Sequence, residues 1–269
     1  MTGTGSGRGL AGLAGVGCVT LLAGAAWHVG PAATWLPPVR RWLPGLAGCG
    51  PGDHVAVTFD DGPGVDSTPA VLAMLAALDV RATFFVLGAA LARHRELGRA
   101  VCAAGHELAV HGWNHRWLLG RPFPAIRDDL ARTRELVTEV AGVAPVWFRP
   151  AYGVLTGDAV LAARGLGMHP VLWTVWGRDW TAAASARSVL EVVSPGLRGG
   201  ATLLLHDADH ATAPGAWNAT VAALPQIVGL AAARGLVLGP LRDHGLRAPR
   251  GEGVARTRAG RRGGRVGLG

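Results

Sequence analysis

The chain has 269 residues, of which 49% are hydrophobic, enough for one large domain with a sizeable core, and this excludes disorder throughout. Its formal net charge of +8 is concentrated at the two ends, because Arg8, Arg40 and Arg41 contribute +3 and the residues after Gly245 contribute +6, which leaves −1 for residues 42–245. A near-neutral central region gives no reason to expect nucleic-acid binding.

The sequence contains no lysine, so all of its basic charge is arginine. This excludes a Schiff-base lysine and the lysine of a phosphate-binding loop as chemical groups. The three cysteines, Cys18, Cys49 and Cys102, do not form the pattern of a disulfide framework.

The amino-terminal region contains an apolar run over residues 10–29 that carries no formal charge unless His28 is protonated. Such a run is long enough to span a bilayer, and it predicts an N-terminal membrane anchor or signal segment over residues 1–30. A glycine-rich buried helix is the alternative. Residues 31–52 are punctuated by proline and glycine and predict a linker.

The region from residue 53 to residue 245 alternates predicted strands and helices. Buried strands are predicted over residues 55–59, 82–87, 107–110, 147–149, 170–176, 201–205 and 236–238. Helices are predicted over residues 69–78 with Thr68 as cap, 95–104, 124–141, 157–164 with Thr156 as cap, 185–193, and 220–234 with a break or kink near Pro225.

This alternation predicts a parallel sheet wrapped by helices, which places the chain in the α/β class. Seven or eight such units can close into a barrel, whose active residues lie on loops after the carboxyl ends of the strands. A flat doubly wound sheet is the competing architecture, although no Gly-x-Gly-x-x-Gly follows the first strand to mark a dinucleotide site.

Two adjacent aspartates, Asp60 and Asp61, directly follow the first predicted strand. Neighbouring carboxylates repel each other, so a fold that keeps both at one strand end gives them different roles or a shared cation. The alternative is a loop start in which one of them only caps backbone NH groups.

His111 and His115 follow the third predicted strand and are four residues apart, so a single turn would direct both imidazoles at one centre. Two histidines and one aspartate on the same rim would make a three-ligand site with a position left for water. That pattern is typical of a catalytic zinc-type centre rather than a structural one.

Three further polar residues stand at the ends of later strands. Arg149 ends the fourth predicted strand, where a structural salt bridge is the alternative to a role in the site. Asp179 follows the fifth strand and His206 the sixth. Asp179 would orient His206 and raise its pKa, as a general acid requires.

Five ordered motifs resemble those of the polysaccharide deacetylases, the NodB-like carbohydrate esterases of family 4. They are Thr58-Phe59-Asp60-Asp61, His111 to His115, Arg149-Pro150-Ala151-Tyr152, Arg178-Asp179-Trp180 and Leu203 to His206. The resemblance covers roughly residues 54–240. It implies an irregular (β/α) barrel of about seven strands and hydrolysis of an N-acetyl or O-acetyl group on a glycan.

The resemblance also implies a role for each residue that matches a motif. Asp60 would be the general base that activates water at a divalent metal, and Arg149 would hold Asp60. The metal, zinc or another such as cobalt, would be bound by Asp61, His111 and His115. His206 would be the general acid, oriented by Asp179. The backbone NH of Tyr152 would stabilise the oxyanion, and Trp180 and Leu204 would wall the acetyl pocket.

Three positions depart from the family pattern. Gly112 stands where the family usually has serine or threonine, which removes a hydrogen bond near the metal unless another group supplies it. Trp176 stands where an aspartate is frequent, which would reshape the groove, and Ala151 replaces a frequent proline, where we expect a mild effect.

The sequence therefore predicts a monomeric, metal-dependent deacetylase of an acetylated cell-wall or related glycan, with a catalytic domain over residues 53–245 and a basic disordered tail over 246–269. The domain is expected to be extracytoplasmic, anchored in the membrane or secreted. One alternative is hydrolysis of a small-molecule amide on the same metal site. Another is a catalytically silent glycan-binding barrel, which predicts loss of Asp60 or His206, and both are present.

Overall fold

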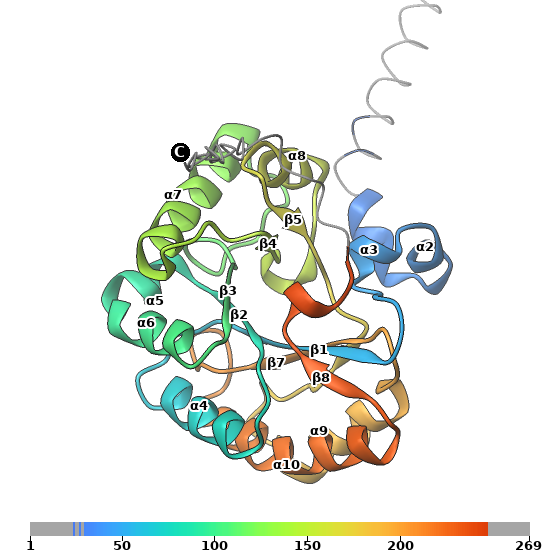
Figure 1. Ribbon diagram of the computed structural model, residues 1–269. Coiled ribbons are helices and arrows are strands. Elements are labelled where there is room, and N and C mark those ends of the chain that lie inside the picture. Colours follow the sequence, from blue (N-terminus) through green and yellow to red (C-terminus); the bar gives the residue numbers. More distant parts are fainter. Residues whose placement is uncertain (1–23, 25–26, 28–29, 247–269) are drawn as a thin grey trace, which may run out of the picture.

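The computed structural model describes residues 24, 27 and 30–246 (Figure 1). The predicted anchor or signal segment, residues 1–30, lies outside the described residues except for Gly24, Trp27 and Gly30, and the predicted tail lies outside them except for Leu246. None of the helices in the described part of the chain is both long enough and apolar enough to cross a membrane.

A parallel sheet of eight strands forms the centre of the described chain. The first strand, β1 (His54–Asp60), pairs with β2, β7 and β8, and the order across the sheet is β5-β4-β3-β2-β1-β7-β6. The other strands are β2 (Thr83–Val86), β3 (Glu107–Val110), β4 (Trp147–Phe148), β5 (His169–Pro170), β6 (Val175–Trp176), β7 (Thr202–His206) and β8 (Val237–Gly239).

Helices surround the strands on the outside (Figure 1). The α-helices are α2 (Pro37–Trp42), α3 (Pro44–Ala47), α4 (Ser67–Ala77), α5 (Gly88–Arg93), α6 (Arg95–Ala103), α7 (Phe123–Ala141), α8 (Gly157–Gly165), α9 (Ala186–Val193) and α10 (Trp217–Ala233). Short 3-10 turns are η1 (Gly30–Trp35), η2 (Ala151–Gly153), η3 (Ser194–Gly196) and η4 (Leu241–Asp243).

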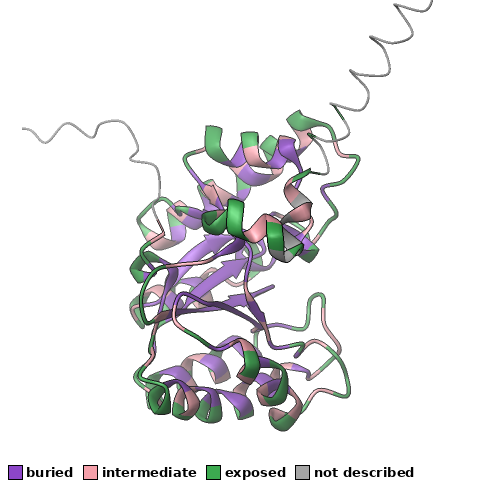
Figure 2. Ribbon diagram, turned by 90° about the vertical axis from the view of Figure 1, so that its right-hand side faces the viewer, coloured by how far each residue is buried: buried purple, intermediate pink, exposed green. Residues whose placement is uncertain are grey.

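The core lies between the strands and this outer layer of helices. Strands β1, β2, β3 and β7 are buried along nearly their whole length, as Figure 2 shows, while the helices expose one face. Apolar residues on both faces of a strand are expected where helices cover a parallel sheet. The predicted α/β barrel of parallel strands is therefore confirmed, and its irregularity is the missing pairing between β5 and β6.

The predicted strand over residues 170–176 is in fact divided into β5 and β6. Between them the carbonyls of Val171 and Leu172 accept hydrogen bonds from the Arg149 guanidinium at 3.3 and 3.1 Å, instead of continuing a strand ladder. The segment between β5 and β6 therefore connects the two ends of the sheet. At one end β5 pairs with β4, and at the other end β6 pairs with β7.

Two predicted helix features differ in the structure. Thr68 does not cap α4, because its hydroxyl donates to Asp207 Oδ2 at 2.6 Å and the helix already begins at Ser67. Helix α10 begins at Trp217 and continues through Pro225 without a break. Helix α5 was not predicted, because its six residues are too few for a helical repeat to be recognised.

The domain also begins earlier than the predicted boundary at Asp53. Residues 44–52, predicted as part of a linker, pack onto the sheet: the carbonyl of Leu46 accepts from the Leu172 backbone NH at 2.9 Å, and that of Gly48 accepts from Thr202 Oγ1 at 2.7 Å. The Ala47 side chain is buried. The Leu46 carbonyl thus satisfies the NH of Leu172, which lies in the gap between β5 and β6.

Candidate active site

The ten predicted site residues come together at the carboxyl ends of the strands, around one pocket of about 420 Å³. This volume lies within the range usual for small-molecule sites, roughly 300–1,000 Å³. The pocket is lined by Asp60, Asp61, His111, His115, Tyr152, Trp173, Trp176, Trp180, Leu204, His206 and Ala211. Arg149 and Asp179 lie behind this lining, each hydrogen-bonded to a residue within it.

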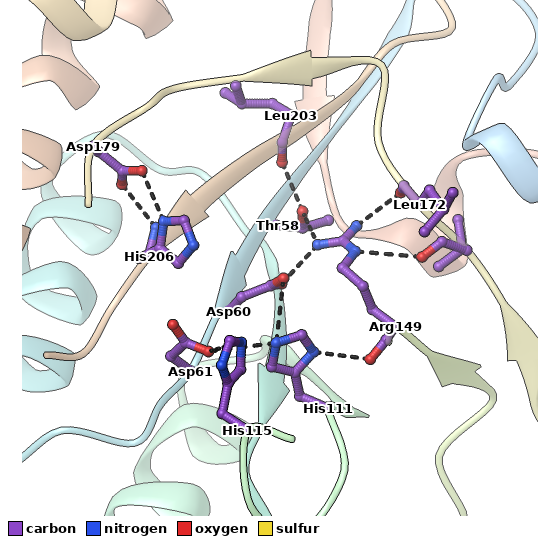
Figure 3. Close-up of polar contacts among 11 residues, drawn as sticks. Thr58, Asp60, Asp61, His111, His115, Arg149, Leu172, Asp179, Leu203 and His206 are labelled. Atoms are coloured by element: carbon purple, nitrogen blue, oxygen red, sulfur yellow. Dashed lines mark hydrogen bonds and ion pairs between the residues drawn. The ribbon is translucent and has the colours of Figure 1, made fainter. Parts of the chain in front are cut away.

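Asp60 is the last residue of β1, and the buried Arg149 side chain holds it in place (Figure 3). Arg149 Nη1 donates to Asp60 Oδ1 at 2.7 Å and to Thr58 Oγ1 at 2.8 Å. The Thr58 hydroxyl in turn donates to the carbonyl of Leu203 on β7. One carboxylate oxygen of Asp60 is thus fixed by a charged partner, and Oδ2 remains on the side of His111, 3.7 Å from its Nε2.

Asp61, His111 and His115 form a cluster whose donor atoms all lie within 4.8 Å of one another. Asp61 Oδ1 is 3.4 Å from Nε2 of each histidine. This oxygen is buried and has no hydrogen-bond partner, which is costly unless a cation satisfies it. Two imidazoles and one carboxylate are the donor set of a catalytic zinc-type centre, so these residues fit a divalent metal.

The charge states of the cluster suit metal binding. Burial alone would raise the pKa of Asp61, but His111, with smaller contributions from His206 and His115, lowers it to about 2. Burial and the neighbouring His111 lower the pKa of His115 to about 4. At neutral pH the cluster therefore presents an ionised carboxylate and a neutral imidazole, the forms that bind metal.

His111 is oriented by its other ring nitrogen. Nδ1 donates to the carbonyl of Arg149 at 2.9 Å, which fixes the tautomer and directs Nε2 at Asp61. Burial opposes the protonated form of His111, but the carboxylates of Asp60 and Asp61 outweigh it and raise its pKa. A divalent metal would compete with that proton for Nε2.

Gly112 needs a left-handed backbone, with φ of 88°, and a Cβ there would lie 3.2 Å from Asp129 Oδ1. The same oxygen accepts a hydrogen bond from the Trp113 backbone NH at 2.8 Å. The loop that carries the two histidines is therefore held by Asp129 of α7, without a hydroxyl at position 112.

The partly buried His206 and the buried Asp179 form a second pair across the pocket from Arg149 (Figure 3). Asp179 Oδ1 is 2.8 Å from His206 Nδ1, and Oδ2 accepts from the His206 backbone NH at 2.8 Å and from the Thr220 hydroxyl at 2.5 Å. Burial would lower the pKa of His206, but Asp179, with help from Asp61 and Asp60, raises it to about 9. His206 is therefore protonated at neutral pH, and its Nε2 is the nitrogen left for the pocket.

Aromatic rings form the walls of the pocket. Trp180 stacks on Trp176 with ring centroids 4.4 Å apart and meets His206 edge-on at 6.0 Å. The buried Leu204 lines the same side. The tryptophan at position 176, where the family often has an aspartate, thus extends the apolar wall rather than adding a charge.

Three non-glycine residues with left-handed backbone lie at this site: Asp61 (φ 78°), Tyr152 (φ 58°) and Arg178 (φ 51°). Such conformations cost on the order of 1–3 kcal/mol each and persist where the surrounding structure over-determines them. Asp61 and Tyr152 line the pocket, and Arg178 directly precedes Asp179, which holds His206. The strained backbone therefore lies where functional groups are placed precisely.

Four residues contribute to the site beyond the ten predicted ones; of these, Thr58 belongs to the first motif and Asp207 directly follows His206 at the end of the sixth predicted strand. Thr220 binds Asp179 from α10, and nothing in its local sequence marks it. Trp173 lines the pocket three residues before Trp176, a spacing that could have drawn attention to it. Thr58 bonds Arg149, and Asp207, buried beside Thr68, has a pKa raised to about 7 by burial and by Asp61 and Asp60.

Comparison with known proteins identifies one family. The family model described as polysaccharide deacetylase matches residues 47–171. A chitooligosaccharide deacetylase from Bradyrhizobium is 39% identical over 155 residues, which cover 57% of this chain and 70% of that protein. The peptidoglycan-N-acetylglucosamine deacetylase PgdA of Listeria monocytogenes is 32% identical over 160 residues, which cover 60% of this chain. The matched part spans about a third of the Listeria protein, 34% of its length.

The fold agrees with these relatives. The crystal structure of a peptidoglycan N-acetylglucosamine deacetylase in complex with an N-hydroxybenzamide compound superposes with a TM-score of 0.68 at 29% sequence identity. The match covers 74% of this chain and 91% of that structure. This likeness agrees with the parallel, incompletely closed barrel described above.

Proposed function

The chain belongs to the polysaccharide deacetylase family, and on that premise we propose that it is a metal-dependent hydrolase that removes acetyl groups from a cell-wall or related polysaccharide. One observation carries the proposal: a carboxylate held by Arg149 and an imidazolium held by Asp179 face the same pocket as a three-donor metal cluster. Base, acid and metal ligands in one pocket are the parts that acetyl hydrolysis requires.

Asp61, His111 and His115 would hold the metal, which, when bound, polarises the acetyl carbonyl and lowers the pKa of water. Zinc suits two imidazoles and one carboxylate, and cobalt accepts the same donors. The chain's own contribution here is orientation, because the Arg149 carbonyl fixes the His111 ring.

Asp60 is the proposed general base. Its Oδ1 is engaged by Arg149, which leaves Oδ2, on the side of the metal cluster, to accept a proton from the attacking water. Arg149 also prevents the carboxylate from rotating away. The adjacent Asp61 has a different task as a ligand, which explains why two aspartates stand together.

His206 is the proposed general acid. With a pKa of about 9 it carries a proton at neutral pH, and Asp179 on its Nδ1 leaves Nε2 to protonate the departing amine or hydroxyl of the sugar. The acetyl methyl group would lie against Trp180 and Leu204, whose apolar surface excludes water. The backbone NH of Tyr152 is the proposed donor to the oxyanion.

Peptidoglycan and chitooligosaccharides are the substrates named for the relatives, and we extend them to this chain as the preferred class. The test measures acetate release by the full chain with added zinc or cobalt against peptidoglycan fragments, N-acetylglucosamine tetramer and acetylated xylan. The control variants are Asp60→Asn and His111→Ala. We expect metal-dependent release from at least one glycan, abolished by both changes. Release only from simple amides, with metal bound, would contradict the proposal in favour of small-amide hydrolysis.

We also propose that the chain acts outside the cytoplasm, anchored by or exported through its amino-terminal apolar run, and as a monomer. Residues 10–29 support the anchor by their composition. The exposed Trp42, preceded directly by Arg40 and Arg41, and the exposed Trp27 suit a membrane interface. Membrane fractionation of the full chain and of a variant lacking residues 1–29 tests it. Equal distribution of the two between membrane and soluble fractions would contradict the anchor.

A further inference from the structure

Arg40 and Arg178 line a second pocket, which lies beside the catalytic one. Its volume is about 220 Å³, and its wall also includes Trp173, Trp176 and Val192. Both tryptophans line the catalytic pocket as well, so the two pockets are neighbours that share these rings. Neither arginine has a task in the hydrolysis proposed above, so acetyl hydrolysis does not account for the second pocket.

The charge of this second pocket is positive. No carboxylate side chain lines it in the part of the chain that the structure describes. The acids next to it in the sequence are engaged elsewhere, because Asp179 is buried within the catalytic site and Glu191 is paired with Arg187. Position 176, where the family often has an aspartate, holds Trp176, whose ring centre is 5.8 Å from the guanidinium carbon of Arg178. The pocket therefore favours an anion.

The size of the pocket limits that anion to a small group. Pockets for drug-sized molecules usually measure roughly 300–1,000 Å³, and this one is smaller. Guanidinium groups match the oxygens of phosphate with paired N–H donors. Two arginines around such a small space suit a single phosphate group.

Helix α2, which supplies Arg40, has the composition of an element that lies on a membrane surface. Leu36, Trp42 and Leu43 are 57%, 85% and 44% exposed, and they flank Arg40 and Arg41. Neither α2 nor its flanking residues include an acid. Arginine beside exposed tryptophan and leucine is typical of segments at the bilayer interface. A phosphate bound next to these apolar side chains is therefore better supplied by a lipid headgroup than by free phosphate.

The residues that follow α2 hold it against the barrel. Helices α2 and α3 lie together at the edge of the barrel (Figure 1). Just after α3, the carbonyl of Gly48 accepts from Thr202 Oγ1, and the carbonyl of Leu46 in α3 accepts from the Leu172 backbone NH. Leu172 directly precedes Trp173, which lines both pockets. A lipid bound at Arg40 would thus fix the catalytic pocket close to the bilayer surface.

We propose that the pocket of Arg40 and Arg178 binds the phosphate of an anionic phospholipid and holds the domain against the bilayer. This inference rests on the membrane location within the proposed function, and it does not depend on acetyl hydrolysis. It assigns to the two arginines a binding role and no part in the chemical step.

The test measures the lipid that the full chain retains in native mass spectrometry after release from a neutral detergent. Phosphatidylglycerol and phosphatidylcholine with the same acyl chains are titrated separately, because both carry a phosphate but only the first has a net charge. We expect the chain to bind phosphatidylglycerol more tightly. Inorganic phosphate at equal concentration should not displace it, since free phosphate makes no contact with the exposed apolar residues.

Arginine variants locate the site. Arg40→Gln and Arg178→Asn should each weaken phosphatidylglycerol binding about fivefold, the usual effect of one arginine near an anionic surface. Asparagine is chosen at position 178 because it tolerates the left-handed backbone there, with φ of 51°. The double variant should bind both lipids equally. Arg187→Gln, on the exposed face of α9 and outside the pocket, is the matched control and should keep the wild-type preference.

Thermal unfolding of each variant checks that it is folded. Arg40→Gln alone carries the test if Arg178→Asn does not fold, because Arg40 lies on α2 and outside the strands. Arg178→Lys keeps a positive charge and should retain more of the lipid preference than Arg178→Asn.

Equal binding of the two lipids by the wild type would overturn the inference, and so would an unchanged preference in both arginine variants. Displacement of phosphatidylglycerol by inorganic phosphate at equal concentration would overturn the assignment to a lipid in favour of a free-phosphate site. A chain that shows the arginine-dependent preference but releases acetate from no glycan would support the lipid site and contradict the proposed hydrolysis alone.

Discussion

The guanidinium of Arg149 donates to Asp60 Oδ1 at 2.7 Å, and the two residues are 0% and 3% exposed. The same side chain bonds the carbonyls of Val171 and Leu172, where the chain crosses between two sheet edges. Arg149 therefore neutralises the charge of the proposed base. It also satisfies the backbone carbonyls between β5 and β6, where no strand pairing closes the barrel. Its loss should affect both stability and activity.

Arg149→Met should destabilise the protein by about 3–5 kcal/mol, because Asp60 would remain buried without its counter-charge. Urea denaturation of the wild type and the variant measures the difference. Arg187→Met is the matched control, since Arg187 pairs with Glu191 on the fully exposed face of α9, and it should cause no measurable change. Equal stability of the two variants would contradict a structural role for the buried pair.

Asp60→Asn and Asp61→Asn should separate the base from the metal ligand. Removing the base lowers kcat by about 10²–10⁴-fold while bound zinc remains at the wild-type level. Asp61→Asn removes a charged ligand and should lose zinc on dialysis. Zinc content by atomic emission and acetate release measure both properties. Loss of zinc from Asp60→Asn would show that Asp60 is itself a ligand.

Asp179→Asn should shift the alkaline limb of the kcat/KM profile to lower pH. A general acid must be protonated, so activity falls as pH rises through the pKa of His206. The Asp179 carboxylate is the largest factor that raises this pKa to about 9, so without it the pKa falls toward the ordinary value of 6.5. Thr220→Val keeps the carboxylate and should move the limb less. Superimposable profiles for Asp179→Asn and the wild type would rule out His206 as the acid.

His106 should make the fold less stable in mild acid. Its Nδ1 accepts from the Ala82 backbone NH at 3.1 Å, and burial, with Arg81 and Arg242 nearby, lowers its pKa from 6.5 to about 4. The unfolded chain then binds this proton more readily than the folded one. The contribution of His106 to stability is complete above pH 6.5 and is lost as pH falls toward about 4.

Urea denaturation at about pH 7 and about pH 5 tests the role of His106. The variant His106→Asn keeps an oxygen acceptor for the Ala82 NH but cannot be protonated in this range. It should lose less stability between the two pH values than the wild type. An equal loss of stability in the wild type and in His106→Asn would show that a group other than His106 causes the acid sensitivity.

The alternation of strands and helices follows from the amino-acid sequence alone, since apolar periodicity and turn residues are local properties of the chain. It also placed Asp60, Asp61, His111, His115, Arg149, Asp179 and His206 on one rim, because parallel strands end at the same edge of a sheet. The position of a residue at a strand end is visible in the local sequence, and this holds for each of these seven residues.

Which distant groups meet depends on the packing of the whole chain. Thr220 bonds Asp179 across 41 positions, and Trp117 stacks on Tyr152 from a different loop. The predicted strand over residues 170–176 is divided because Arg149, which follows β4, donates hydrogen bonds to two of its carbonyls. Such contacts depend on how helices and loops pack against the sheet, and local backbone preference carries no information about that packing.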